Sequence, residues 1–338
     1  MDFEILLYYK FVPVPDPIHE REQTLQKCQE LGLKGRIIIA PEGVNGTVSG
    51  PAEATAKFRD WMNDHPLFRG TEFKIDPYPT HAFKRLSVKA REEIVTLGTA
   101  CEPWRNTGPF LEPAEFKRMI EEEDPLILDI RNDYEYEIGR FKGAVRPDVT
   151  TFKEFPAWLE TVLPAAGDRP VLTYCTGGIR CEKLTAYLRD CGFDNVYQLH
   201  GGIVTYGKDP STQGEHWEGV CYVFDDRISV PIGPEVRPVT RCQQCQQESP
   251  RYVNCANVDC NKQFVLCESC EATTDRTCSE ACSLAERKRE PNAKLELALR
   301  SERIRQRRQA WRQRRKERQR AERAQCAAVA DSTVPEKS

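Results

Sequence analysis

Two apolar runs that end beside polar or thiol side chains constrain the fold of this 338-residue chain most. PLILDIR ends with Asp129 and Arg131, and PVLTYC ends in Cys175. Helices are expected around them at residues 114–122, 152–162 and 182–190. A third strand is expected at residues 196–199. Strands that are apolar throughout and alternate with helices predict a parallel sheet covered on both faces. Because active sites lie at the carboxyl ends of such strands, Asp129 and Cys175 are expected at the same edge.

The segment YCTGGIRCEK predicts a reactive thiol. Cys175 stands at a strand end, and the loop Thr176, Gly177, Gly178 and Ile179 leads into a helix. Such a loop can point backbone N–H groups at the sulfur, and the positive helix end and Arg180 favour a thiolate. We therefore interpret Cys175 as the nucleophile, the alternative being a buried structural thiol. Cys181, in the first helical turn, can relay a persulfide or simply pack against the sheet.

Residues 1–97 read as a small sheet with helices on one face. Phe3–Phe11 is an apolar run of strand length, and a helix is expected over residues 20–31. Strands at residues 36–40 and 47–49 flank a turn predicted at Asn45-Gly46. Pro51 is expected in a first helical turn. This segment shows no cluster of nucleophile, base and metal ligand.

Residues 240–284 contain eight cysteines in four short pairs, which predict metal binding. The ligand candidates are Cys242, Cys245, Cys255, Cys260, Cys267, Cys270, Cys278 and Cys282. Cysteines separated by short loops reach one tetrahedral ion, and eight thiols complete two zinc sites of four cysteines. A site closed in this way is structural. An iron–sulfur cluster and a metal-free thiol-rich segment are the alternatives.

The chain shows neither a long apolar run nor a secretory signal at its start, so we expect no membrane span and a cytoplasmic protein. Thiols in that compartment are normally reduced, so the 15 cysteines indicate catalysis or metal binding rather than disulfides.

The charge of the chain is strongly polarised. Residues 287–323 contain 16 Lys/Arg and 5 Asp/Glu, a net charge of +11, so the remainder carries −14 of the total of −3. We predict a basic helical arm over residues 285–326 and a disordered tail over residues 327–338. The arm suits phosphate contacts without sequence readout, and the alternative is a solvated charged helix. The RNA-binding candidates are Arg312, Arg314, Arg315, Lys316, Arg318 and Arg320.

Three stretches of residues 110–225 resemble the rhodanese family. They are LDIRNDYEYEIGRFKGA, which includes Asp129, Arg131 and Glu135, the loop CTGGIR, and GFDNVYQLHGGI. The resemblance implies a parallel α/β catalytic domain and a persulfide formed on Cys175. It also implies that Arg180 closes the loop and that Asp129 supports the fold near the site. Cys175, Arg180, Asp129 and Arg131 are thus the catalytic candidates.

The longer fragments IIIAPEGVNGTVSG, HAFKRLSVKAREEIVTLG, YCTGGIRCEK and CYVFDDRISVP, in this order, resemble the tRNA uridine hydroxylase family known as TrhO, formerly YceA. The resemblance covers about residues 3–282. It implies oxygen-dependent conversion of uridine 34 of tRNA to 5-hydroxyuridine. It also implies a ferredoxin-like, acylphosphatase-like α+β domain at the amino terminus.

The activity has two alternatives, a sulfurtransferase with a persulfide on Cys175 and a zinc-stapled RNA-binding adaptor without catalysis. Hydroxylation requires O2 and a source of electrons, and the sequence offers no flavin or nucleotide motif that names the electron donor. CYVFDDRISV reads as an apolar strand that ends in charges, either a strand edge with an ion pair or a neighbour of the catalytic loop. The sequence does not predict an oligomeric state.

Overall fold

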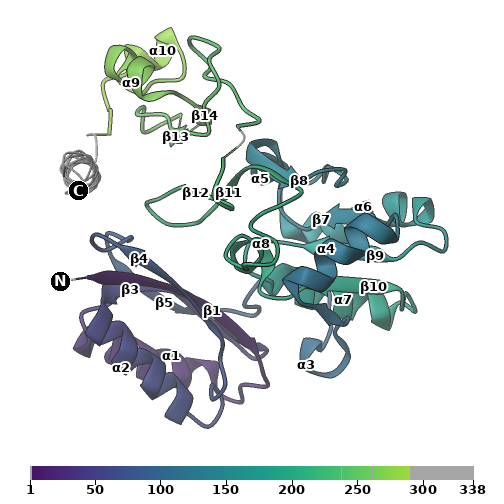
Figure 1. Ribbon diagram of the computed structural model, residues 1–338. Coiled ribbons are helices and arrows are strands. Elements are labelled where there is room, and N and C mark those ends of the chain that lie inside the picture. Colours follow the sequence, from purple (N-terminus) through teal and green to yellow (C-terminus); the bar gives the residue numbers. More distant parts are fainter. Residues whose placement is uncertain (1, 237, 261, 290–338) are drawn as a thin grey trace, which may run out of the picture. The chain divides into compact units, whose positions relative to one another are not determined.

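The computed structural model describes residues 2–236, 238–260 and 262–289 of the chain (Figure 1). Its first part is a five-stranded sheet in the order β4-β1-β3-β2-β5. Strands β1, β3, β2 and β4 pair in antiparallel fashion, and β5 joins β2 in parallel. The elements are β1 (Phe3–Phe11), α1 (Pro17–Glu30), β2 (Lys34–Ala40), β3 (Gly43–Pro51), α2 (Ala52–Asp64), β4 (Phe73–Tyr78) and β5 (Leu86–Ala90). Up to β4 this order is the ferredoxin-like arrangement expected from the resemblance.

The two faces of this sheet have different partners. Leu6 and Tyr8 on β1 are fully buried, and they share a hydrophobic core with Phe58 and Met62 of α2. Since side chains alternate along a strand, Leu7 and Tyr9 lie on the face opposite these helices. Figure 1 shows α1 and α2 together on one side of the sheet. The other side is therefore free to pack against the following part of the chain.

The turn predicted at Asn45-Gly46 is wrong. Both residues lie inside β3, where Asn45 pairs with Ile38 and Gly46 with Ile37, and the hairpin turns at Pro41 and Glu42 instead. A Cβ on Gly46 would come within 2.5 Å of the Tyr8 ring. Gly46 thus serves the close approach of an aromatic ring in the core rather than a turn.

The parallel sheet predicted from the apolar runs is present, in the order β6-β10-β9-β7. Its strands are β6 (Phe110–Leu111), β7 (Leu126–Asp129), β9 (Val171–Tyr174) and β10 (Val196–Leu199). The surrounding helices are α3 (Pro103–Asn106), α4 (Pro113–Glu122), α5 (Asp133–Ile138), α6 (Phe155–Val162) with short 3-10 turns at Phe152–Glu154 and Leu163–Ala165, α7 (Ile179–Asp190) and α8 (Gly202–Tyr206).

Separate cores cover the two faces of this sheet. Leu128 of β7 packs with Phe155 of α6 and Leu184 of α7, whereas Leu172 of β9 packs with Phe116 of α4 and Ile203 of α8. Strands buried on both sides explain why the apolar runs show no alternation. The carboxyl ends of β7 and β9 then meet at one edge, as predicted.

The remaining strands form two small sheets. In the first, β11 (Trp217–Tyr222) pairs with β8 (Gly139–Phe141) and β12 (Ser229–Pro231). The second is the hairpin of β13 (Tyr252–Asn254) and β14 (Gln263–Val265), which is followed by α9 (Glu268–Thr274) and α10 (Glu280–Ser283).

Residues 285–289 differ from the predicted start of a helical arm. They are not helical, and the Arg289 N–H donates to the carbonyl of Ala256 at 2.7 Å. The Val258 N–H in turn donates to Arg287, which holds this segment against the cysteine block. The rest of the predicted arm and tail lies outside the described residues.

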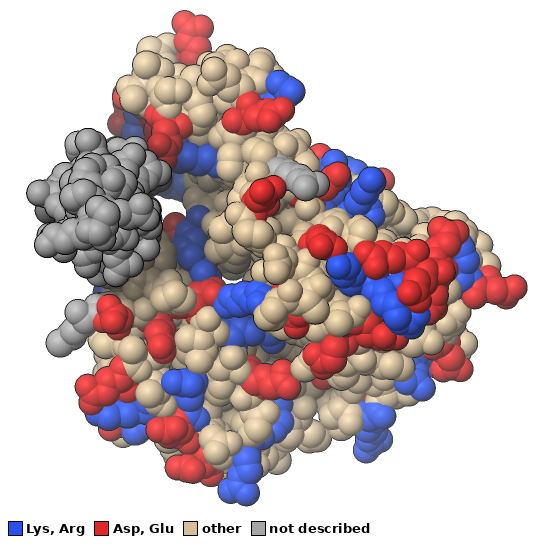
Figure 2. Space-filling view, in the orientation of Figure 1, with Lys and Arg blue, Asp and Glu red and all other residues tan. Residues whose placement is uncertain are grey.

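Charged side chains are intermixed on the surface that carries α4 (Figure 2). Arg118 on this helix pairs with Glu115, Glu122 and Glu123. Exposed pairs of this kind contribute about 0–1 kcal/mol each to stability. They do, however, occupy the guanidinium, so it offers no free anion site. Among the described residues, no helix has both the length and the apolar character that crossing a membrane requires.

Candidate active site

Cys175 lies between β9 and α7, and its loop is held from several directions. The residue is fully buried, and the Gly178 N–H donates to its sulfur at 3.1 Å. The N–H groups of Ile203 and Val204, at the start of α8, donate to the carbonyls of Cys175 and Thr176 at 3.0 and 3.2 Å. The backbone therefore curves around the sulfur, as the glycines of the sequence predicted.

Glycine is required at the point where α8 approaches this loop. Gly202 has a φ of +70°, and a Cβ there would lie 2.5 Å from the Cys175 carbonyl oxygen and 2.7 Å from that of Thr176. A side chain at Gly202 would thus combine backbone strain with a clash against the loop. This contact explains the second glycine of the GFDNVYQLHGGI segment, whereas a Cβ on the first, Gly201, would lie 2.2 Å from the Thr205 hydroxyl.

The surroundings of Cys175 favour a thiolate. Burial alone would raise its pKa, but a hydrogen bond from the Cys181 thiol, the charge of Arg180 and the N–H groups of Cys181 and Gly178 outweigh burial and lower the pKa to about 5. Burial and the neighbouring Cys175 raise the pKa of Cys181 well above its ordinary value. Cys181 is therefore a protonated donor to Cys175 rather than a second thiolate at neutral pH.

The positive charge of Arg180 stabilises the Cys175 thiolate, and Glu135 holds the Arg180 side chain in place. The two side chains form a double hydrogen bond of 2.7 and 2.9 Å, and Glu135 is fully buried. Burial would raise the pKa of Glu135, but the Arg180 charge and hydrogen bonds lower it below the ordinary value. A weaker contact of 3.4 Å joins Arg180 to the Thr176 hydroxyl. Glu135 was part of the matching motif, but its partnership with Arg180 was not predicted.

Asp129 and Arg131 pair with each other and not with the thiol. The Arg131 guanidinium donates to the two carboxylate oxygens of Asp129 at 2.8 and 2.5 Å, and both side chains are fully buried. The Tyr174 hydroxyl donates to Asp129 at 2.7 Å, and Arg131 also donates to the Gly139 carbonyl at 2.6 Å. The pair therefore ties β7 to the end of β9, where the loop of Cys175 begins, and to β8.

The face of the amino-terminal sheet opposite α1 and α2 packs over the loop of Cys175. A Cβ on Gly177 would lie 3.1 Å from the Leu7 side chain, and one on Gly178 would lie 2.7 Å from the Tyr9 hydroxyl. The Tyr9 hydroxyl donates to Glu182 of α7 at 2.9 Å. Burial raises the pKa of Glu182 to about 7, against the lowering effect of this hydrogen bond. Sequence reasoning found no site residues in this segment, and no local motif marks Tyr9.

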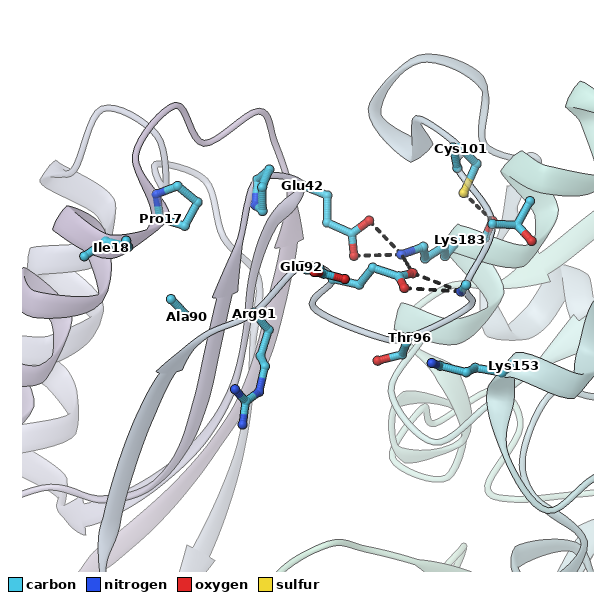
Figure 3. Close-up of a pocket in the computed structure, with 15 residues that line it drawn as sticks. Pro17, Ile18, Glu42, Ala90, Arg91, Glu92, Thr96, Cys101, Lys153 and Lys183 are labelled. Atoms are coloured by element: carbon cyan, nitrogen blue, oxygen red, sulfur yellow. Dashed lines mark hydrogen bonds and ion pairs between the residues drawn. The ribbon is translucent and has the colours of Figure 1, made fainter.

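A second set of contacts joins the same sheet to α7 (Figure 3). The buried Lys183 ammonium donates to Glu42 at 2.7 and 2.8 Å, to Glu93 at 2.6 Å and to the Val95 carbonyl at 3.0 Å. Glu42, Glu93 and Lys183 border a cavity of about 1030 Å³, whose wall also includes Cys101. Lys183 thus anchors the amino-terminal sheet to the helix that begins at the loop of Cys175.

The charges of the CYVFDDRISV segment also face the amino-terminal sheet. Arg227 donates to Asp225 at 2.8 and 2.6 Å and to Asp76 of β4 at 2.8 Å. The predicted ion pair is therefore present. The centre of the Phe224 ring lies 6.0 Å from the Arg180 guanidinium, so the segment also neighbours the end of the Cys175 loop.

The eight cysteines of residues 240–284 form two groups of four. Cys242, Cys245, Cys267 and Cys270 make the first group. Cys255, Cys260, Cys278 and Cys282 make the second. Within each group the sulfur atoms all lie within 4.8 Å of one another, and three of the sulfur pairs are 3.6 to 3.8 Å apart: Cys245 with Cys267, Cys260 with Cys278, and Cys278 with Cys282. Four sulfurs at 2.3 Å from a tetrahedral zinc are about 3.8 Å apart, so both groups fit a metal ion.

The six basic residues predicted to contact RNA, Arg312 to Arg320, lie outside the described residues. The other predicted site residues are all described. The structure brings Cys175, Arg180 and Cys181 together, and it places Asp129 and Arg131 in a separate pair.

Known proteins resemble this chain over most of its length. A family model described as a UPF0176 acylphosphatase like domain matches residues 3–94, a rhodanese-like domain matches residues 112–209, and a rhodanase C-terminal model matches residues 218–283. A curated protein of Listeria monocytogenes serotype 4a is 48% identical over 285 residues, which are 83% of this chain and 89% of the relative. A Bacillus licheniformis protein is 47% identical over 83% of this chain and 88% of its own length. Both relatives are named tRNA uridine(34) hydroxylase.

Proposed function

Because this chain belongs to the tRNA uridine(34) hydroxylase family, we propose that it converts uridine 34 of tRNA to 5-hydroxyuridine with Cys175 as its catalytic thiol. The observation that carries the proposal is the state of Cys175. Its sulfur accepts the Gly178 N–H at 3.1 Å, and its neighbours lower its pKa to about 5. A thiolate is the reactive form of cysteine, so this residue is ready for attack at neutral pH.

The reaction replaces the C5–H bond of the uracil ring with C5–OH. In the proposed sequence the Cys175 thiolate adds to C6, and the electron pair of the C5–C6 double bond makes C5 nucleophilic. O2 supplies the oxygen and a two-electron reductant supplies electrons, so one oxygen atom joins C5 and the other leaves as water. Loss of the C5 proton and of the sulfur then restores the double bond. Arg180 and the loop N–H groups favour the thiolate as it leaves.

Nucleoside mass spectrometry of tRNA tests the activity. Cells lacking the protein are complemented with wild type or with Cys175→Ser, which keeps the size of the side chain. We expect 5-hydroxyuridine and nucleosides derived from it to disappear in the null strain and to return only with wild type. Loss of thiolated nucleosides instead would identify a sulfurtransferase, and no change in either would leave an RNA-binding adaptor.

The addition of sulfur to C6 has a separate test. A covalent complex of the chain with a uridine-containing anticodon stem-loop is expected in denaturing mass spectrometry, and Cys175→Ser should abolish it. If wild type forms no adduct under turnover while Cys175 is still needed for product, addition to C6 is wrong, and the thiol acts in another form, such as a persulfide.

We also propose that the two cysteine groups hold zinc. Both consist of four thiols without histidine, which is the ligand set of closed structural zinc sites. Bound zinc would join segments of the chain and would supply no chemistry to Cys175. Elemental analysis of purified full chain is expected to give two zinc per chain. Iron with visible colour would instead indicate an iron–sulfur cluster.

The basic segment of residues 287–323 is proposed to contact tRNA phosphates. Its net charge of +11 against −14 for the remainder supports this proposal, since an RNA backbone attracts such a segment without sequence readout.

A further inference from the structure

The face of the amino-terminal sheet that lies opposite α1 and α2 also carries a lysine, Lys74. Lys74 of β4 pairs directly with Leu7 of β1 in antiparallel register. Directly paired residues share a face of the sheet, and Tyr9 follows two positions after Leu7 on that face. The Lys74 ammonium lies 5.3 Å from the centre of the Tyr9 ring. Lys74 therefore belongs to the face that covers the loop of Cys175.

This face touches the catalytic loop through neighbours on both sides of Lys74. Leu7 approaches Gly177, and the Tyr9 hydroxyl approaches Gly178, whose N–H donates to the Cys175 sulfur. Tyr9 also fixes Glu182 on α7. The thiolate, Glu182 and Lys74 are close enough to influence one another, since the negative charges of Cys175 and Glu182 act on the Lys74 ammonium.

The bonding of Lys74 contrasts with that of other lysines near this interface. Lys183 has four hydrogen bonds to Glu42, Glu93 and a carbonyl. Lys208 is paired with Asp76 and a carbonyl. Within residues 2–236, 238–260 and 262–289, by contrast, Lys74 has no carboxylate within 4.0 Å and no hydrogen-bond acceptor. The residue is partly exposed and lies on β4, an edge strand of the sheet.

Removing an ammonium from water without giving it a hydrogen-bond acceptor costs free energy, and this cost favours the neutral amine. Burial lowers the pKa of Lys74, against the opposing charges of Glu72, Cys175 and Glu182. An anionic or strongly polar oxygen placed beside Lys74 would satisfy the ammonium and restore its charge. Because Lys74 lies on the face that covers the loop of Cys175, the substrate is the natural source of this oxygen.

We propose that Lys74 is a substrate-positioning residue that binds an oxygen of the target nucleotide and thereby holds its uracil ring against Cys175. The proposal rests on the tRNA hydroxylation proposed above. Two oxygens share the required chemistry, a phosphate flanking the target nucleotide and O4 of its uracil ring. In either case the amino-terminal sheet supplies one wall of the reaction site, and the rhodanese-like part supplies the thiol.

Binding measurements with full-length protein test the proposal without any need for turnover. The probes are two anticodon stem-loops that differ only in uridine or cytidine at position 34. We compare wild type, Lys74→Ala, the charge-preserving Lys74→Arg and Lys89→Ala. Lys89 is an exposed lysine of β5, at the opposite edge of the same sheet, so it serves as a matched control.

Lys74→Ala is expected to weaken binding of the uridine stem-loop by about tenfold, with recovery in Lys74→Arg and no change in Lys89→Ala. If Lys74→Ala binds both stem-loops more weakly, and its affinity depends less on salt concentration, then Lys74 binds the phosphate. If only the uridine stem-loop is bound more weakly, then Lys74 binds O4 of the uracil ring. If Lys74→Ala binds both stem-loops like wild type, the proposal is overturned.

Product formation in cells separates this proposal from the function on which it rests. If wild type restores 5-hydroxyuridine and Lys74→Ala restores much less, both stand. If wild type restores it and Lys74→Ala restores as much, only the role of Lys74 is wrong. If wild type itself restores none, the hydroxylase function fails, while the binding measurements still decide on Lys74.

Discussion

Replacing Cys181 tests how the site stabilises the Cys175 thiolate. Both residues are fully buried, and Cys181 keeps its proton because burial and the neighbouring thiolate raise its pKa. The Cys181 thiol is the leading hydrogen-bond donor that lowers the pKa of Cys175 against the effect of burial. Cys181→Ala removes this donor and leaves the Arg180 charge and the Gly178 N–H in place.

The size of the effect follows from the strength of the lost hydrogen bond. A hydrogen bond to a charged group contributes about 1.5–3 kcal/mol, and one pKa unit corresponds to about 1.4 kcal/mol. Loss of the Cys181 donor should raise the pKa of Cys175 from about 5 to about 6–7. Because the pKa is depressed, the thiolate is lost as the pH falls through it. At pH 6 wild type is therefore mostly thiolate, and Cys181→Ala is half protonated or more.

The assay is the thiolate absorbance at 240 nm as a function of pH. Subtracting the signal of the same protein with Cys175→Ser removes the contribution of the other 14 cysteines. Cys181→Ser is the matched control, because its hydroxyl can donate to the same sulfur and should keep the midpoint low. A midpoint in Cys181→Ala equal to that of wild type would refute the reasoning.

The same variants decide whether Cys181 has a chemical role. A donor can be a hydroxyl, whereas a persulfide relay requires sulfur. If Cys181→Ser still restores 5-hydroxyuridine in cells, Cys181 is a positioning residue for Cys175. If product is lost while the midpoint stays low, Cys181 takes part in sulfur chemistry.

Three further predictions concern stability and binding. Glu135→Gln leaves the Arg180 guanidinium buried without its counter-charge, so urea unfolding should show a loss of about 3–5 kcal/mol; a midpoint like that of wild type would contradict this. Chelation of the proposed zinc should expose residues 240–284 to proteolysis while residues 3–209 stay resistant, and equal resistance of both would argue against structural metal. Truncation after Arg289 should weaken tRNA binding and reduce its salt slope, and an unchanged slope would exclude the basic segment as a phosphate contact.

The catalytic loop was predictable because its geometry is local. A strand end, two glycines and a helix start occupy adjacent positions, so YCTGGIRCEK by itself predicts both the curvature and the thiolate. The apolar runs around Asp129 and Cys175 likewise predict strands buried on both faces. The sequence did not reveal that Asp129 and Arg131 satisfy each other, because the choice between neighbouring acceptors depends on which groups β7, β8 and β9 bring together.

The contribution of the amino-terminal sheet could not be predicted from the sequence. Leu7 and Tyr9 belong to a regular apolar strand, and nothing local separates the face toward α2 from the face toward Gly177 and Gly178. Only the docking of two units far apart in the chain makes the second face part of the site. The wrong turn at Asn45-Gly46 has a related cause, since Gly46 is required by the Tyr8 ring and not by the hairpin.

The metal ligands were also predictable only in part, because their spacing is local whereas their grouping depends on the fold. The short loops predicted which cysteines act in pairs, but not which pairs share an ion. In the structure the first pair joins the third and the second joins the fourth, so Cys255 and Cys260 lie inside the segment closed between Cys245 and Cys267. An ion bound to the first group therefore shortens the flexible chain that separates the two cysteine pairs of the second group. Bringing these pairs together then costs less conformational entropy. We expect the two sites to fill cooperatively, and metal titration that shows two independent sites would contradict this coupling.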